Sequence, residues 1–489
     1  MLSLIALAAL APITLTSAQS NDETVLGVYM FHRHGDRTPK ALAPANLTAL
    51  GAQQVYQSGQ YYRNRYISSD APYRINGINS DLVKQSQIAV SAPDDTVLQN
   101  SATGFLQGLY PPVGSTIGTQ TLRNGSNITA PMNGYQFVPV DIVSTGSGSE
   151  DSSWLQSTSN CAKAQIDSNS YFSSQEYIDK LASTKDFYAA LEPVVNGTFD
   201  SSQTSFKNAY TIFDLINVAE IHNSSIPASD VLTPEVLFQL RTLADAHEWG
   251  LAYNSSESAS NDMRAIAGKT LAAQIVQFLN STITLQGKTK IGVQFGAYAT
   301  FASFFGLADL PSVNTDFTGV TDYASAMTFE LFTNNSVTVS SASYPSEEEI
   351  YVRFLFHNGT TTSESEPVAY PLFGSGSETI SWSDFKENMN KFAIGDMKDW
   401  CMACGNSTGT CAAYVSGSAN AADAGSDGAS SGRGNGLSPV VNGVIGAMVT
   451  LAIILGLEAL VLAVGGFRVV KKRSTRKGDV GEVSETTKA

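Results

Sequence analysis

The residues with the clearest chemical potential stand together at 31–39, with the sequence FHRHGDRTP. His34 lies in this run between two arginines, Arg33 and Arg37. A guanidinium presents planar pairs of donors that match phosphate oxygens, and an imidazole can attack phosphorus as a nucleophile. These residue types therefore predict a site where His34 takes up a phosphoryl group that Arg33 and Arg37 hold.

The element that must position this site is the apolar run at 25–30, VLGVYM, which predicts a buried strand. Open α/β sheets place their ligand crevice at the carboxyl ends of strands. Gly35 is expected to let the backbone approach the ligand, and Pro39 to stiffen the turn. Because side chains alternate along a strand, His32 shares the crevice face with His34 only if the strand continues that far. The alternative interpretation of residues 31–39 is a basic turn at the surface that contacts only water or a carboxylate.

The run fills every fixed position of the pattern RHGxRxP, and so resembles the signature of the histidine acid phosphatases, in the phosphoglycerate-mutase-like superfamily. Residues 47–66 and the segment FLQGLYPP at 105–112 also resemble that family, in a fungal-type, membrane-anchored form. The resemblance implies an α/β fold with a mainly parallel sheet flanked by helices and a helical insertion domain. It also implies His34 as the catalytic nucleophile, Arg33 and Arg37 as phosphate ligands, and no cofactor or metal.

Two further elements of the family pattern are missing, so the second half of the site looks degenerate. The family has another phosphate arginine in an RSTxxxR stretch, where this chain has Ser91 within VSAPDDTV. The family also has a His-Asp pair after a late strand, where this chain has Ala297 and Tyr298. Loss of that pair removes the acid that protonates the leaving alcohol. Four side chains could substitute for it, namely Asp36, Asp94, Tyr298 and His247.

Each possible substitute acid also has an ordinary structural interpretation. Asp36 and Asp94 fit solvated turn carboxylates, Tyr298 fits a core tyrosine, and His247 fits a histidine on a helix surface. His222 and His357 adjoin glycosylation sequons and are expected at the surface.

Composition and patterning divide the chain into seven parts. An apolar N-terminus that ends in Thr-Ser-Ala predicts a signal peptide, a Ser/Gly/Ala-rich stretch predicts a flexible stalk, and a later apolar run is long enough to span a bilayer. The expected parts are a signal peptide (1–18), the first part of the α/β domain (22–120), the helical insertion (121–260), the second part of the α/β domain (261–414), the stalk (415–439), the transmembrane helix (443–467) and a cytoplasmic tail (468–489).

The predicted location is the cell surface, as a type I single-pass plasma membrane protein with a glycosylated extracellular domain. Basic residues after the span predict a cytoplasmic C-terminus, and the polar tail that follows disfavours a GPI signal. Ten Asn-x-Ser/Thr sequons support secretion. The net charge of −15 makes nucleic acid an unfavourable partner.

Four cysteines are expected to form two disulfides, for which three connectivities exist. We expect Cys404 to pair with Cys411 and Cys161 with Cys401. A zinc site at Cys401 and Cys404 is the alternative, but no second pair of ligands has matching spacing.

The first functional hypothesis is a histidine acid phosphatase-like cell-surface protein that hydrolyses phosphomonoesters through a phosphohistidine, with weak activity. The second is a catalytically impaired pseudophosphatase that binds a phosphorylated ligand or a protein partner through Arg33, His34 and Arg37. A third is a structural glycoprotein in which both arginines only tie loops together. The sequence does not predict the phosphate ester or the oligomeric state.

Overall fold

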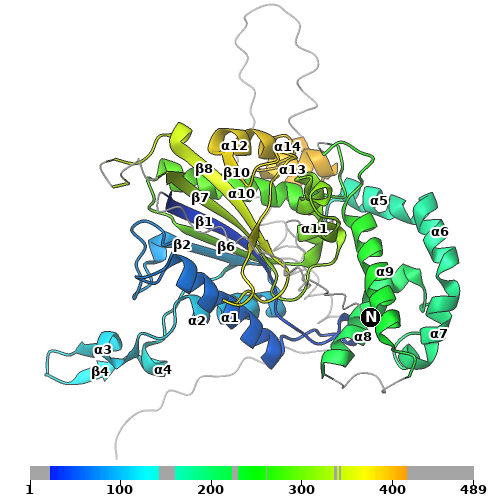
Figure 1. Cartoon of the computed structure of the whole chain (residues 1–489), viewed down its shortest axis with the longest axis horizontal. Coiled ribbons are helices and arrows are strands. Elements are labelled where there is room, and N and C mark those ends of the chain that lie inside the picture. The colour runs from blue at the N-terminus through cyan, green and yellow to red at the C-terminus, as the bar shows by residue number, and fades with distance from the viewer. Residues whose placement is uncertain are drawn as a thin grey trace, which may run out of the picture. The chain divides into compact units, whose positions relative to one another are not determined.

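The computed structural model describes residues 23–142, 160–222, 230–259, 261–334, 339–340 and 343–415, all within one compact unit. A central sheet crosses this unit with helices on both faces (Figure 1). Its strand order is β10-β8-β7-β1-β6-β2-β5, with β9 beside β8. The strands are β1 (Glu23–Arg33), β2 (Ile88–Ala92), β5 (Asp141–Ile142), β6 (Ile291–Gly296), β7 (Ala326–Asn334), β8 (Ile350–His357), β9 (Val368–Ala369) and β10 (Thr379–Ser381), and a separate hairpin pairs β3 (Thr119–Thr121) with β4 (Asn127–Thr129).

The predicted α/β fold with a mostly parallel sheet is confirmed. Strands β1, β6, β2 and β5 run parallel, while β7 lies antiparallel between β1 and β8. The register pairs Arg33 on β1 with Gly296 on β6, and Ser91 on β2 with Gln294 on β6. The carboxyl ends of these three strands therefore meet at one edge of the sheet. Strand β1 reaches Arg33, three residues beyond the predicted run at 25–30.

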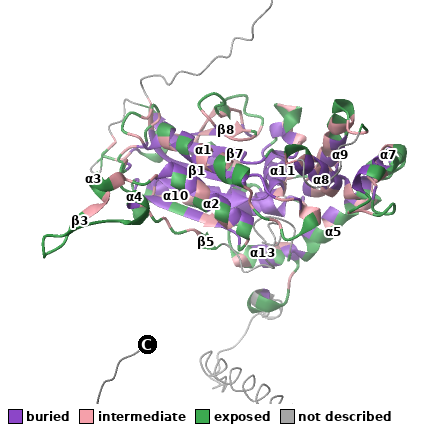
Figure 2. Cartoon of the chain, turned by 90° about the horizontal axis from the view of Figure 1, so that it is seen from below, coloured by how far each residue is buried: buried purple, intermediate pink, exposed green. Residues whose placement is uncertain are grey.

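Alternate residues of β1 enter two different cores. Val28 and Met30 pack under α1 (Ala49–Tyr66) and α2 (Thr96–Leu109), whereas Tyr29 and Phe31 pack under α10 (Ile266–Thr284) and α11 (Tyr298–Leu307). This alternation is expected for a strand with both faces covered. Figure 2 shows the buried residues in purple along the central strands and on α11.

The helices α5–α9 form a second layer beside the sheet (Figure 1), and α6–α9 share a hydrophobic core of their own. Helix α9 has a strong start, because Thr233 caps its amino end with a side chain that accepts from the amide of Val236, and Pro234 lies in the first turn. Thr184 separates α6 from α7. The helices are α5 (Ala162–Ser170), α6 (Gln175–Ser183), α7 (Lys185–Val195), α8 (Ala209–His222) and α9 (Pro234–Ala252).

Shorter helices complete the described chain. The remaining α-helices are α3 (Gly114–Gly118), α4 (Pro131–Gly134), α12 (Trp382–Asn390), α13 (Met397–Cys404) and α14 (Ala412–Val415). Single 3-10 turns lie at Lys40–Leu42, Gln85–Gln87, Tyr171–Ser173, Phe206–Asn208, Leu310–Ser312, Thr315–Thr318, Glu347–Glu349 and Gly409–Cys411.

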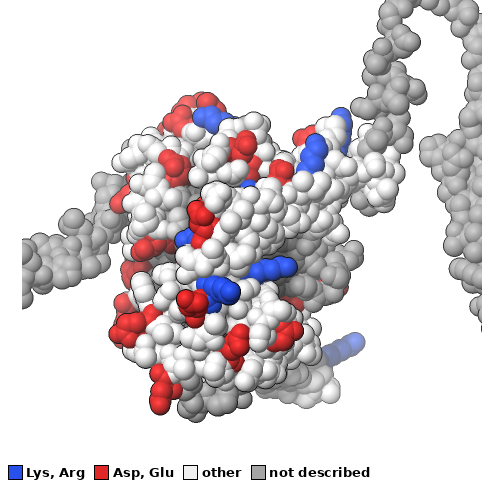
Figure 3. Space-filling view, turned by 90° about the vertical axis from the view of Figure 1, so that its right-hand side faces the viewer, with Lys and Arg blue, Asp and Glu red and all other residues white. Residues whose placement is uncertain are grey.

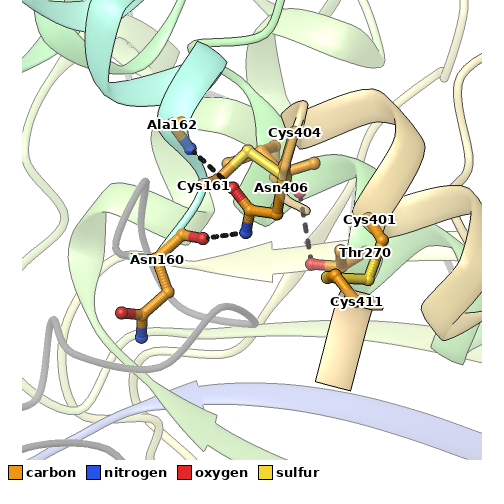
Figure 4. Close-up of a disulfide and its surroundings, with 9 residues drawn as sticks. Asn160, Cys161, Ala162, Thr270, Cys401, Cys404, Asn406 and Cys411 are labelled. Atoms are coloured by element: carbon orange, nitrogen blue, oxygen red, sulfur yellow. Dashed lines mark hydrogen bonds between the residues drawn. A yellow bond between two sulfur atoms is a disulfide. The ribbon is translucent and has the colours of Figure 1, made fainter. Parts of the chain in front are cut away.

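Two disulfides form, but the expected pairing is wrong. Cys161 pairs with Cys404, and Cys401 pairs with Cys411 (Figure 4). Cys401 and Cys404 both lie on α13, so sequence distance does not decide which of them meets Cys161. The pairing is decided by the segment after α13. Asn406 donates to the carbonyl of Asn160 and accepts from the amide of Ala162, and these two bonds hold the end of α13 beside Cys161.

The predicted signal peptide at 1–18, the transmembrane helix at 443–467 and the cytoplasmic tail lie outside the described residues, as does the stalk beyond residue 415. Within the described part of the chain, no helix has the length and apolar character needed to cross a membrane.

Candidate active site

The signature turn at 33–37 leaves the end of β1 and is held on two sides. The amide of Arg33 donates to the carbonyl of Ser325, and the amide of Ala324 donates to the carbonyl of His34. On the other side Gly35 packs against Gly51 near the start of α1, so closely that a Cβ on Gly35 would collide with the Gly51 backbone. Gly35 therefore allows the signature turn to approach α1 closely.

The predicted nucleophile, His34, is fully buried. Its Nδ1 lies 2.8 Å from the carbonyl oxygen of Gly35. A carbonyl oxygen only accepts, so Nδ1 carries the proton and the lone pair of the neutral ring lies on Nε2. The Tyr323 ring packs 5.6 Å from the imidazole, centroid to centroid. This geometry fixes the tautomer that a nucleophilic imidazole requires.

The two predicted phosphate ligands are buried and already engaged by protein groups. Arg33 donates through Nη1 to the carbonyl of Thr321, and its guanidinium lies 4.5 Å from the centre of the Tyr323 ring. Arg37 forms an ion pair with Asp214, in which Nη1 and Oδ1 are 3.0 Å apart and the side chains are 0% and 2% exposed. The hydroxyl of Tyr210 is 3.5 Å from Arg33 Nη2 and 3.4 Å from Arg37 Nη2.

Tyr210 and Asp214 come from α8 in the helical layer, and sequence reasoning missed both. Besides Arg37, the carboxylate of Asp214 accepts from the amide of Lys40 at 2.8 Å and from the hydroxyl of Tyr323 at 3.3 Å. A cavity of about 20 Å³ remains beside Arg33, between Tyr210, Asp214 and Tyr323. That volume holds about one water molecule.

The positions of the missing His-Asp pair lie at the same sheet edge as His34. Strand β6 ends at Gly296, opposite Arg33, and Ala297 and Tyr298 follow directly. Ala297 is buried and has no group that can donate a proton. The Tyr298 ring centre lies 5.4 Å from the Arg33 guanidinium, but its hydroxyl donates to Glu248 Oε2 at 2.8 Å. The tyrosine therefore borders the site with its proton directed to another carboxylate.

The buried carboxylate of Asp36, the first possible substitute acid, is held at the amino end of α1. Its Oδ2 accepts from the Thr48 hydroxyl and lies 2.6 Å from Nε2 of His222. The positive end of the α1 dipole favours a negative charge there. The expectation that Asp36 is a solvated turn residue is wrong, and His222, which we expected at the surface, is only 28% exposed in its side chain.

The other two candidates, Asp94 and His247, have different surroundings. Asp94 is exposed in the turn after β2. His247 is 5% exposed within the core of the helical layer, where its ring centre is 5.4 Å from that of Phe206, so its expected place on a helix surface is wrong. Its Nδ1 lies 2.8 Å from Glu248 Oε1. Glu248 thus joins Tyr298 to His247, a role that its sequence context did not indicate.

The orientation of His32 is settled by the end of β1. The strand ends at Arg33, and the His32 ring stacks on Phe295 with 4.9 Å between centroids and meets the edge of Phe105 at 5.2 Å. Burial lowers the pKa of His32 to about 4 despite its hydrogen bond to the Arg33 carbonyl. His32 is therefore a neutral core residue that belongs to the α1–α2 side.

Charge outside the site is predominantly acidic. Figure 3, which views the molecule from the side of the helical layer, shows acidic groups at several places with fewer basic groups among them. Positive charge for a phosphate must therefore come from local groups such as Arg33 and Arg37. Within the described ranges no group of three His, Cys, Asp or Glu side chains could hold a metal ion.

Comparison with protein families identifies the class to which this fold and this site belong. Residues 41–357 match the model of the histidine phosphatase superfamily (branch 2). The chain therefore belongs to the histidine phosphatase superfamily, and the resemblance seen in the signature is confirmed.

Among individual proteins, the chain is similar to prostatic acid phosphatases. It is 24% identical to the human protein over 398 residues, which cover 78% of this chain and 89% of that protein. It is 25% identical to the bovine protein over 293 residues, or 56% of this chain and 66% of that protein. The fold is also similar to solved phytases from Citrobacter braakii (TM-score 0.50, 13% identity, 78% of this chain and 99% of that chain) and from Klebsiella sp. (TM-score 0.50, 10% identity, 77% and 98%).

Proposed function

We propose that this protein hydrolyses phosphomonoesters through a phosphohistidine at His34, with weak activity. The observation that carries the proposal is the hydrogen bond from His34 Nδ1 to the Gly35 carbonyl at 2.8 Å, which leaves the lone pair of the imidazole on Nε2, in a segment that also holds Arg33 and Arg37. Nε2 attacks phosphorus, and the bond from phosphorus to the ester oxygen breaks. Water then hydrolyses the phosphohistidine to inorganic phosphate and returns the imidazole. Arg33 and Arg37 stabilise the charge on the non-bridging oxygens.

The weak activity follows from the missing acid. With Ala297 and Tyr298 at the positions of the His-Asp pair, and the Tyr298 hydroxyl donating to Glu248, the leaving alcohol must depart without help from that pair. General acid catalysis is worth roughly 10²–10⁴ in rate. The substrates are therefore esters with stable leaving groups, such as aryl phosphates, while alkyl phosphates turn over much more slowly.

A second candidate is a protein that binds a phosphorylated ligand without turning it over. One observation favours it: the signature keeps Arg33 and Arg37, whereas Ala297 and Tyr298 stand where the family has its His-Asp pair. In this case the signature retains the charge for binding but the site completes no catalytic cycle.

The proposed location is the cell surface, with the α/β unit outside and a single span at 443–467. Ten sequons support secretion, and none of the nine sequon asparagines in the described residues is buried. The two disulfides also fit an oxidising compartment.

The test is turnover of an aryl phosphate by the purified protein at acidic to neutral pH, beside the variants His34→Ala and His357→Ala. His357 lies at the end of β8, outside the signature, and serves as the matched control. We expect activity in the wild type and in His357→Ala, and none in His34→Ala. Equal activity in His34→Ala would exclude the proposed mechanism. No turnover in any of the three, with phosphate still raising the Tm of the wild type, would favour the binding protein.

A further inference from the structure

We propose that Asp214 and Tyr210 of α8 act as a built-in anion that occupies the phosphate-binding arginines, so that a phosphate group must displace them to bind. The inference rests on the proposed function in one respect, namely that Arg33 and Arg37 are the phosphate ligands. It adds that the affinity of this site is set by a side chain of the helical layer.

The contacts of Asp214 are those that a bound phosphate oxygen would make. Both carboxylate oxygens lie within 3.1 Å of Arg37 Nη1, at 3.0 Å for Oδ1 and 3.1 Å for Oδ2. Oδ2 also accepts a backbone amide, that of Lys40, at 2.8 Å. A guanidinium and a backbone amide are the donors that proteins use for oxyanions.

Tyr210 places an oxygen beside the second arginine, Arg33, where a phosphate oxygen would otherwise bind. It stands one helical turn before Asp214, so both side chains project from the same face of α8. Its hydroxyl oxygen lies between the two guanidiniums, 3.5 Å from Arg33 Nη2 and 3.4 Å from Arg37 Nη2. One face of one helix thus supplies an oxygen to each arginine of the signature.

The space between Arg33 and α8 is small. The cavity beside Arg33 is about 20 Å³, enough for one water molecule and too small for a phosphate group. The Nε of Arg33 is buried and has no hydrogen-bond partner among the described residues. Because Nη1 of Arg37 already contacts Asp214 and Nη2 contacts Tyr210, a phosphate that binds these donors must displace those oxygens.

An alternative role for Asp214 is purely structural, in which it holds Arg37 in position and a phosphate adds to the pair. The two roles predict opposite responses to removal of the carboxylate charge. A built-in anion competes with phosphate, so its removal strengthens phosphate binding. A positioning group supports phosphate binding, so its removal weakens it.

The test is the affinity of the full chain for inorganic phosphate, measured by calorimetry in the wild type, Asp214→Asn and Asp186→Asn. Asp186 is exposed in the first turn of α7, and Asp186→Asn removes the same charge from the same helical layer. We expect Asp214→Asn to bind phosphate roughly tenfold to a hundredfold more tightly than the wild type, as for a charge-assisted hydrogen bond that no longer has a competitor. Asp186→Asn should match the wild type.

The Tm gives a second readout. Without phosphate, Asp214→Asn should melt below the wild type because Arg37 loses a buried counterion. Added phosphate should raise its Tm by more than it raises that of the wild type. Unchanged or weaker phosphate binding by a folded Asp214→Asn protein would overturn the inference. If that variant does not fold, Tyr210→Phe replaces it, and should bind phosphate more tightly than the wild type. Weaker or unchanged binding by Tyr210→Phe would equally overturn it.

The measurements of phosphate binding and of turnover distinguish a failure of this inference from a failure of the proposed hydrolysis. Tighter phosphate binding by Asp214→Asn, with no turnover in any protein, would keep the inference and reject hydrolysis. His34-dependent turnover without tighter binding would keep hydrolysis and reject the inference.

Discussion

The buried carboxylate of Glu330 on β7 gives the sharpest prediction for stability. It is 0% exposed and receives four hydrogen bonds: Arg65 Nε at 3.1 Å and Nη2 at 2.9 Å, the Tyr66 hydroxyl at 2.6 Å, and Arg353 Nε at 2.9 Å. Removing one partner from a buried ion pair costs about 3–5 kcal/mol, because the remaining charge is left without compensation. Arg353 keeps a second carboxylate, that of Glu23 at 2.8 Å. We therefore expect Glu330→Gln to lower the free energy of unfolding by about 3 kcal/mol, the lower end of that range.

The assay is urea unfolding at neutral pH, followed by tryptophan fluorescence, with Glu347→Gln as the matched control. Glu347 pairs with Lys386 at the surface, where the side chains are 46% and 36% exposed, so its loss should cost at most about 1 kcal/mol. A loss for Glu330→Gln no larger than that of the control would refute the reasoning, because the network would then contribute no more than a surface pair.

The same residue predicts a pH dependence. Burial alone would raise the pKa of Glu330, but the guanidiniums of Arg65 and Arg353 and the Tyr66 hydroxyl outweigh it, so the pKa lies below the ordinary 4.5. A lowered carboxyl pKa stabilises the fold above the unfolded value, and this contribution is lost as pH falls through the folded value. The difference in stability between the wild type and Glu330→Gln should therefore be full at pH 7 and shrink below about pH 4.5. A difference that grows on acidification would contradict this.

Three further outcomes are expected. Gly35→Ala should sharply lower the yield of folded protein, because the added Cβ collides with the backbone of Gly51; a normal yield and an unchanged Tm would count against that packing. His32, whose pKa is lowered to about 4, should stay neutral at pH 5.5 by NMR, and stability should fall as pH drops from 6.5 toward 4, because the unfolded chain binds the proton first; a charged His32 at pH 5.5 would disprove its burial. Mass spectrometry without reduction should find the peptide of Cys161 linked to that of Cys404, and the double serine variant at these positions should lose about 2–5 kcal/mol; a link from Cys161 to another cysteine would reject the pairing.

The part of the site that comes from one continuous segment was predictable from the sequence. Arg33, His34 and Arg37 follow a strand within a fixed pattern, and the register of β1 and β6 then brings Ala297 and Tyr298 to the same edge. Local signals also predicted the α/β class, since apolar periodicity acts over a few residues.

The groups that engage the arginines were not predictable in this way. Tyr210 and Asp214 lie 177 residues along the chain from their partners Arg33 and Arg37, and no motif marks them. Their position depends on how the helical layer docks on the sheet. The prediction of the cysteine pairing failed for the same reason, because Cys401 and Cys404 share a helix and only tertiary contacts distinguish them.

The most direct test of the central claim is to trap the covalent intermediate. The purified protein is mixed briefly with an aryl phosphate, quenched in alkali, where a phosphohistidine is stable, and mapped by mass spectrometry beside His34→Ala. We expect phosphate on the peptide that contains His34 in the wild type and none in the variant. Turnover without phosphate on that peptide, or the same label in His34→Ala, would contradict it.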